Sequence, residues 1–158
     1  MKIGFIGAGN MAQAMIGGIL RNGIAKKEEI IASAATNKTI TKVAAEFGIK
    51  TTLDNRETAL ADFLFLAVKP VYYQQVIDEI KDVEAKESQI IITIAAGKSI
   101  EWVENAFGSC RKIIRTMPNT PALVGEGITA VCPGSNIKDK ELESVLELLN
   151  SFGKAEVI

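Results

Sequence analysis

Apolar residues along this chain alternate between two patterns. Short continuous runs, such as residues 3–6 and 63–68, are typical of strands that are covered on both faces. Between such runs, apolar residues recur at helical spacing, as Met11, Met15 and Ile19 do. The pattern predicts strands at residues 3–6, 29–32, 49–52, 63–68, 90–95, 113–117, 128–131 and 155–158. It predicts helices at residues 11–20, 41–47, 55–60, 70–83, 99–107 and 142–152.

Strands that alternate with helices indicate βαβ units, and therefore a mainly parallel sheet with helices on both faces. The predicted fold class is α/β, a doubly wound sheet of the Rossmann type. No internal repeat, low-complexity tract or linker-like composition divides the sequence. We therefore expect residues 1–158 to form a single domain.

Composition narrows the classes of function. The net charge is −1, from 18 basic and 19 acidic residues, so no basic excess is present to neutralise a nucleic acid and we expect no such partner. The longest apolar run, residues 63–68, is too short to span a bilayer, so we expect no membrane partner. Two cysteines cannot build a disulfide framework, which favours a cytoplasmic location. The chain has no histidine, the commonest metal ligand and acid–base residue, and we expect no metal.

A glycine-rich loop lies directly between the first predicted strand and the first predicted helix. Its sequence, Gly7-Ala8-Gly9-Asn10-Met11-Ala12, matches the G-x-G-x-x-A pattern of dinucleotide-binding folds. Gly7 allows the tight turn, Gly9 lets the backbone approach a pyrophosphate, and Ala12 permits close packing of helix on strand. The N–H groups of the first helical turn then face the phosphates. The sequence therefore predicts a dinucleotide site at this loop.

Small and polar residues also follow the other predicted strands. In an open α/β sheet, ligands bind beyond the carboxyl ends of the strands. Each loop alone also fits ordinary turn chemistry, because turns favour the same residue types. Together the loops favour a ligand that lies across this edge of the sheet.

The loop after the second predicted strand bears on the choice of nucleotide. NAD-specific folds place an acidic residue about 20 positions past the glycines, but no Asp or Glu occurs between Ile30 and Ala45. Ser33 ends the strand, and the nearby charges are Lys38 and Lys42. A hydroxyl and a lysine can hold a ribose 2′-phosphate by charge-assisted hydrogen bonds. The sequence therefore predicts NADP as the cofactor, with NADPH preferred over NADH. The alternative is that Lys38 is a solvated residue at a helix start.

Four segments of the chain form a more specific set. They are Gly4-Phe5-Ile6-Gly7-Ala8-Gly9-Asn10-Met11, Ala67-Val68-Lys69-Pro70, Ala95-Ala96-Gly97 and Arg115-Thr116-Met117-Pro118-Asn119-Thr120-Pro121. Together they resemble the pyrroline-5-carboxylate reductase family, over the whole chain. The first segment is shared with β-hydroxyacid dehydrogenases, whereas the second and fourth, in this order, are much more specific. The resemblance implies reduction of 1-pyrroline-5-carboxylate to proline with NAD(P)H, the last step of proline biosynthesis.

The resemblance also implies a role for each matching position. The pyrophosphate loop is matched by Ile6, Gly7, Ala8, Gly9, Asn10 and Met11. Ser33 matches the position at the adenosine ribose or its phosphate, and Asn55 matches an asparagine that contacts the cofactor. The walls around the nicotinamide are matched by Ala67, Val68, Lys69, Pro70, Ala95, Ala96 and Gly97. The substrate-facing segment is matched by Met117, Pro118, Asn119 and Thr120. Asn55 equally fits a helix cap, and no residue is assigned a catalytic role.

The chain departs from the family pattern at its end. Family members continue into an all-helical domain that forms a homo-oligomer and supplies much of the substrate pocket, whereas this sequence stops at Ile158. We therefore expect the cofactor-binding part of the enzyme, poorly active by itself. Imine reduction agrees with the absence of histidine, because an imine nitrogen accepts a proton from a weak donor or water. Two other functions stay open: a β-hydroxyacid-type or other NADP oxidoreductase, and a non-catalytic dinucleotide-binding module.

Overall fold

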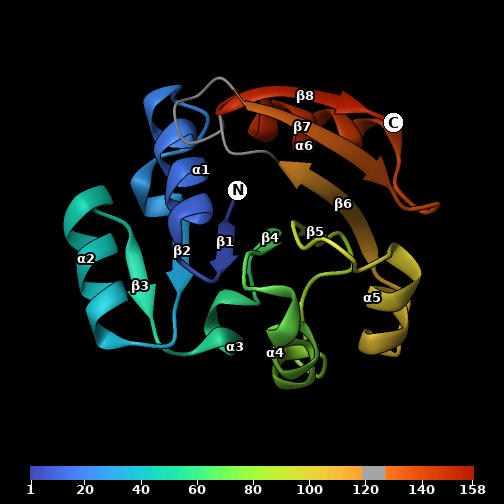
Figure 1. Cartoon of the computed structure of the whole chain (residues 1–158), viewed down its shortest axis with the longest axis horizontal. Coiled ribbons are helices and arrows are strands. Elements are labelled where there is room, and N and C mark those ends of the chain that lie inside the picture. The colour runs from blue at the N-terminus through green and yellow to red at the C-terminus, as the bar shows by residue number, and fades with distance from the viewer. Residues whose placement is uncertain (119–126) are drawn as a thin grey trace.

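Eight strands of one sheet carry helices on both sides (Figure 1). The computed structural model describes residues 1–118 and 127–158, and these eight strands lie within that part of the chain. In chain order the elements are β1 (Ile3–Ile6), α1 (Asn10–Arg21), η1 (Lys27–Glu29), β2 (Ile30–Ser33), α2 (Asn37–Phe47), β3 (Lys50–Thr52), α3 (Asn55–Thr58), β4 (Phe63–Leu66), η2 (Pro70–Tyr72), α4 (Tyr73–Ile80), β5 (Ile90–Thr93), α5 (Ile100–Phe107), β6 (Lys112–Pro118), β7 (Gly127–Pro133), α6 (Asp139–Asn150) and β8 (Gly153–Val157).

The strands lie in the order β3-β2-β1-β4-β5-β6-β7-β8. From β3 to β6 all neighbouring pairs are parallel. β7 runs antiparallel to β6, and β8 is parallel to β7. The chain order therefore reverses direction at β1, which lies between β2 and β4. This arrangement confirms the predicted Rossmann-type, mainly parallel α/β sheet.

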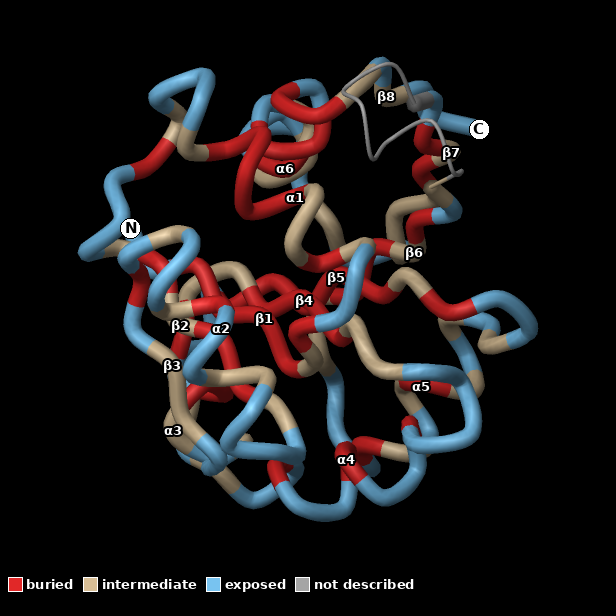
Figure 2. Tube along the Cα trace, turned by 60° about the vertical axis from the view of Figure 1, so that its left-hand side comes forward, coloured by how far each residue is buried: buried red, intermediate tan, exposed pale blue. Residues whose placement is uncertain are grey.

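Two hydrophobic cores cover the two faces of the sheet. On one face, side chains of α1, α2 and α6 pack with Phe5 and Phe65, whose rings stack with their centroids 4.5 Å apart. On the other face, α4 and α5 pack against Ile6, Leu66 and Ile91. Figure 2 shows the central strands as largely buried segments between these layers. Because both faces are covered, β1, β4 and β5 need apolar side chains at almost every position, which explains their continuous apolar runs.

The structure contains the predicted elements, but several of their ends differ, and the predicted helix 70–83 is divided into η2 and α4, which ends at Ile80. α2 begins at Asn37 rather than at residue 41, because its polar first turn carries no apolar periodicity. The Thr36 hydroxyl caps this helix by accepting a hydrogen bond of 3.3 Å from the Thr39 N–H. β4 ends at Leu66 rather than at residue 68, because the apolar run continues through Ala67 and Val68 into the loop that follows the strand.

α1 lies unusually close to the turn between α6 and β8. A Cβ atom built on Gly18 would stand 2.7 Å from both the Phe152 Cβ and the Ser151 carbonyl oxygen. The Asn22 side chain spans the same contact, because its Nδ2 donates to the Gly18 carbonyl at 2.9 Å and to the Ser151 carbonyl at 2.7 Å. Only glycine fits at position 18 while this contact is kept.

We predict that Gly18→Ala lowers the free energy of unfolding by about 1–3 kcal/mol, because the methyl group must push α1 away from Phe152. The measurement is chemical denaturation followed by circular dichroism. Gly17→Ala is the matched control, since its new Cβ meets the flexible end of Arg21 at 3.1 Å and the Phe47 ring at 3.5 Å, which is an ordinary contact. That variant should equal the parent or gain up to about 1 kcal/mol from helix propensity. Equal stability of the two alanine variants would contradict the packing argument.

Candidate functional site

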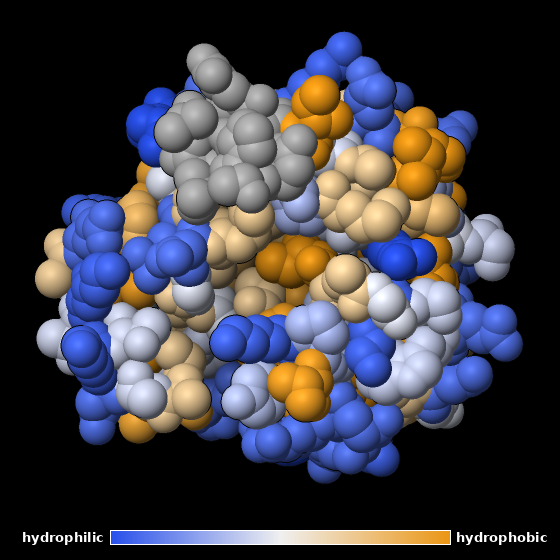
Figure 3. Space-filling view, viewed as in Figure 1, coloured by the Kyte–Doolittle hydropathy of each residue, from blue (hydrophilic) through white to orange (hydrophobic). Residues whose placement is uncertain are grey.

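The carboxyl ends of the parallel strands bring five loops to one edge of the sheet. β1, β2, β4, β5 and β6 point the same way, so the residues that follow them gather at this edge. Figure 3 shows a hollow near the middle of the molecule, with apolar atoms at its floor and hydrophilic atoms around its rim. Two adjoining pockets lie at the β1 and β2 end of this edge, and both are lined by Gly7, Ala34 and Ala35.

The glycine loop has the shape that the sequence predicts. Gly7 turns the chain with φ +100°, and a Cβ on it would lie 2.8 Å from the Ala67 carbonyl group. Gly9 is the N-cap of α1, and a Cβ on it would meet no atom within 4 Å. The first turn of a helix leaves its N–H groups without partners inside the helix. Open space in front of such N–H groups is suited to a phosphate.

The first pocket lies between the amino-terminal ends of α1 and α2 and has a volume of about 480 Å³. Its lining residues are Gly7, Ala8, Gly9, Asn10, Gln13, Ala34, Ala35, Lys38, Thr39 and Lys42. Lys38 and Lys42 extend from successive turns of one helix, so both contribute positive charge to the same side of the pocket. Two lysines opposite the N-terminus of α1 give this pocket a positive electrostatic character, which suits an anion such as a phosphate group.

The second pocket, of about 410 Å³, lies between the loops that follow β2 and β4. Its lining residues are Gly7, Ala34, Ala35, Leu53, Asn55, Val68, Tyr72, Gln75, Val76 and Glu79. Apolar walls with a few polar groups suit a flat aromatic ring that carries hydrogen-bonding edges. The two pockets together could hold a ring, a ribose and the phosphates of one nucleotide.

A chain of hydrogen bonds fixes the polar side of this second pocket. The Ser33 hydroxyl donates to Asn55 Oδ1 at 2.8 Å, and Asn55 Nδ2 donates to Glu79 Oε2 at 3.1 Å. Ser33 is completely buried, so its hydroxyl orients Asn55 from behind the pocket wall. Asn55 is the member of the pair that lines the pocket. The structure thus places Asn55 at the site, and Ser33 behind it.

Sequence reasoning missed Glu79. It lies on α4, far along the chain from the loop after β2, and nothing in its local sequence distinguishes it from a solvated helix residue. It enters the pocket only because α4 packs beside α3, which carries Asn55. The loop after β2 has no acidic residue, but Glu79 brings an acidic side chain into the pocket beside it.

The predicted nicotinamide walls follow β4 and β5. Ala67 donates its N–H to the Ile6 carbonyl at 2.8 Å, which ties the start of one wall to β1. Lys69 is exposed, and Pro70 begins η2. In the other wall, Ala95 is buried, whereas Ala96 and Gly97 are exposed and Gly97 has φ +79°.

The remaining predicted positions lie at different depths. Ile6 is buried in the sheet, and Met11 is half-buried against the core. Met117 is 37% exposed at the carboxyl end of β6, where Pro118 follows it. Asn119 and Thr120 lie outside the described residues.

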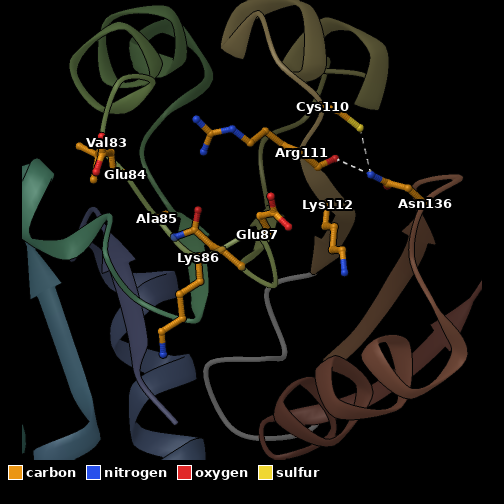
Figure 4. Close-up of a pocket in the computed structure, with 10 residues that line it drawn as sticks. Val83, Glu84, Ala85, Lys86, Glu87, Cys110, Arg111, Lys112 and Asn136 are labelled. Carbon is orange, nitrogen blue, oxygen red and sulfur yellow. Dashed lines mark hydrogen bonds between the residues drawn. The ribbon is translucent and has the colours of Figure 1, made fainter.

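A separate pocket of about 360 Å³ opens at the opposite edge of the sheet (Figure 4). It is bounded by residues 83–87 and Gln89, by Cys110, Arg111 and Lys112, and by Asn136. Asn136 Nδ2 donates to the Arg111 carbonyl at 3.1 Å, and desolvation lowers the pKa of the Arg111 guanidinium. No predicted site residue lines this pocket, because it lies at the amino-terminal ends of β5 and β6.

Metal, membrane and thiol chemistry add little to the site. Within residues 1–118 and 127–158, no group of three or more His, Cys, Asp or Glu side chains could hold a metal ion. No helix in those ranges is both long and apolar enough to cross a membrane. Cys110 is exposed and Cys132 is half-buried, and both are free thiols.

Comparison with known proteins gives consistent matches. The family described as "NADP oxidoreductase coenzyme F420-dependent" matches residues 2–97. The pyrroline-5-carboxylate reductase of Escherichia coli is 39% identical over 158 residues, which cover 99% of this chain and 58% of the relative. This chain therefore spans less than two thirds of that relative's length.

Two solved structures extend the comparison to the fold. A pyrroline-5-carboxylate reductase from Coxiella burnetii superposes with a TM-score of 0.94 at 30% identity, over 99% of this chain and 58% of that one. The Plasmodium falciparum pyrroline carboxylate reductase, solved with NADP bound, gives a TM-score of 0.88 at 33% identity, over 100% of this chain and 57% of that one.

Proposed function

Because the chain belongs to the family of coenzyme F420-dependent NADP oxidoreductases and is a nicotinamide dinucleotide-binding domain, we propose that it binds NADPH as the cofactor part of a pyrroline-5-carboxylate reductase. The observation that carries the proposal is the open Gly9 loop beside two lysines, in a chain 39% identical along its length to a reductase of that name. The reaction is the reduction of a cyclic imine, 1-pyrroline-5-carboxylate, to proline.

The described residues fit the cofactor in three places. The backbone of Gly9 and Asn10 would hold the pyrophosphate at the N-terminus of α1. Asn55 and the apolar residues Leu53, Tyr72 and Val76 of the second pocket would hold the adenosine. Lys38 would hold the ribose 2′-phosphate in the first pocket. Glu79 lies in the second pocket, and Ala34 and Ala35 stand between the two.

The chemistry asks for positioning more than for acid–base groups. When bound, the reduced nicotinamide supplies the hydride that adds to the imine carbon. The loops 67–70 and 95–97 would hold the nicotinamide ring between them. The substrate would then lie beside Met117 and Pro118, next to the ring. An imine nitrogen accepts its proton from a weak donor or from water, so the reaction agrees with a chain that has no histidine.

We predict tighter binding of NADPH than of NADH, by about 5–30-fold, from a contact between Lys38 and the 2′-phosphate. Calorimetric titration of both cofactors at moderate salt measures this ratio. Lys38→Glu should weaken NADPH binding far more than NADH binding. Lys140→Glu, the same charge change on an exposed residue of α6, should leave the ratio unaltered. Equal affinities in the parent chain would refute the preference.

We predict that Gly9→Val abolishes cofactor binding and leaves the fold intact. The new side chain has room in the free protein, since no atom lies within 4 Å of its Cβ, but it fills the space that the pyrophosphate needs. Circular dichroism and a denaturation curve check the fold, and NADPH fluorescence checks binding. A folded variant with unchanged NADPH affinity would remove the phosphate loop from the proposal.

The proposed activity is tested by steady-state NADPH oxidation with saturating 1-pyrroline-5-carboxylate. We propose that the part of the relatives outside this chain's span supplies the wall that faces the nicotinamide and orients the substrate. The 158-residue chain should then bind NADPH but turn over at least about 100-fold more slowly than the chain joined to the remaining part of the E. coli relative. Comparable rates would show that these residues hold a complete site. Activity on hydroxyacids in place of the imine would favour a β-hydroxyacid-type enzyme.

A further inference from the structure

The hydrogen-bond ladder between β4 and β5 stops one rung early. The Asp62 carbonyl accepts from the Ile90 N–H at 3.0 Å, and the register continues to the pair Leu66 and Thr93. In a parallel ladder, carbonyl groups that bond to the same neighbour recur at every second residue. Two such steps from the pair of Asp62 and Ile90 lead to the Leu66 carbonyl and the Ile94 N–H. These two groups would bond to each other if the ladder continued.

The phenol of Tyr73 occupies that last rung. Its hydroxyl donates to the Leu66 carbonyl at 2.5 Å and accepts from the Ile94 N–H at 3.2 Å. Tyr73 is the first residue of α4 and is completely buried, packed in the core with Val76 and Ile77. One oxygen atom therefore stands between two backbone groups that elsewhere in this sheet pair directly.

The position of this oxygen matters because the strands separate immediately beyond it. After Leu66 the chain stays beside β1, because the Ala67 N–H donates to the Ile6 carbonyl. After Ile94 it continues into Ala95 and Gly97. The two arms of this fork are the loops 67–70 and 95–97, the proposed walls of the nicotinamide subsite. A phenol that keeps Leu66 and Ile94 apart sets the distance between the arms at their base.

We propose that Tyr73 is a positioning residue whose hydroxyl holds the β4–β5 fork open to the width that the nicotinamide half of the cofactor requires. The inference rests on the proposed function, because the fork is a subsite only if a nicotinamide dinucleotide binds. Burial raises the pKa of the Tyr73 phenol, so the hydroxyl stays protonated and can donate and accept at once. Phenylalanine keeps the packing but frees Leu66 and Ile94 to bond directly and narrow the fork.

The experiment compares two ligands on the full 158-residue chain and on Tyr73→Phe. NADPH reports on both halves of the site, and 2′-phospho-ADP-ribose reports on the adenosine half alone. We expect Tyr73→Phe to weaken NADPH binding by about fivefold or more and to change 2′-phospho-ADP-ribose binding by less than about twofold, by calorimetry. If the phenylalanine variant does not fold, Tyr73→Met provides the same test with a flexible apolar side chain.

Gln89→Leu is the matched control. It also removes buried side-chain bonds to backbone carbonyls, at Ala59 and Ala61, but at the opposite edge of the sheet. This variant should lose stability with no change in the ratio of the two affinities. A merely structural role for Tyr73 predicts the same behaviour for Tyr73→Phe, and an unchanged ratio in that variant would overturn the inference. If the parent chain binds neither ligand, the proposed function fails, and this inference fails with it.

Discussion

Gly7 follows β1, at the point where the chain passes between the ends of the neighbouring strands β2 and β4. The geometry of the whole ligand edge depends on how closely the backbone approaches those two strands at Gly7. Its N–H donates to the Ser33 carbonyl at 2.9 Å, and its α-carbon passes so near Ala67 that a Cβ would come within 2.8 Å of that carbonyl group. The turn has φ +100°, which residues with a side chain rarely adopt. A bulkier residue would push β1 away from β4, and α1 would no longer begin beside the open space at Gly9.

Charge is distributed unevenly around this turn. On one side, Lys38 and Lys42 face the positive end of the α1 dipole across the first pocket. On the other side, Glu79 receives a hydrogen bond from Asn55 in the second pocket. Ala34 and Ala35 line both pockets and separate them. Anionic groups are therefore favoured on the α2 side, and hydrogen-bond donors on the α4 side, which is consistent with the proposed orientation of the nucleotide.

The part of the edge beyond β4 and β5 has a different character. Apart from the exposed Lys69, its loops offer backbone groups and uncharged side chains, and the Tyr73 phenol lies beneath them. A surface of mainly neutral groups positions a ligand by its shape and spacing, because hydrogen bonds between neutral groups are weaker than those made by charged groups. Reduction of an imine suits this arrangement, because the difficult part is to align a hydride donor with a C=N bond.

Features that depend on neighbours along the chain could be predicted from the order of the amino acids. The strand–glycine–helix order around Gly7 and Gly9 predicted the glycine loop, and continuous apolar runs predicted the buried parallel strands. Packing of the elements was needed to bring Ser33 to Asn55, Glu79 into the second pocket and Tyr73 into the β4–β5 ladder. Each of these contacts joins residues on different elements. Local propensity acts over a few residues, whereas such contacts arise only when helices pack on a folded sheet.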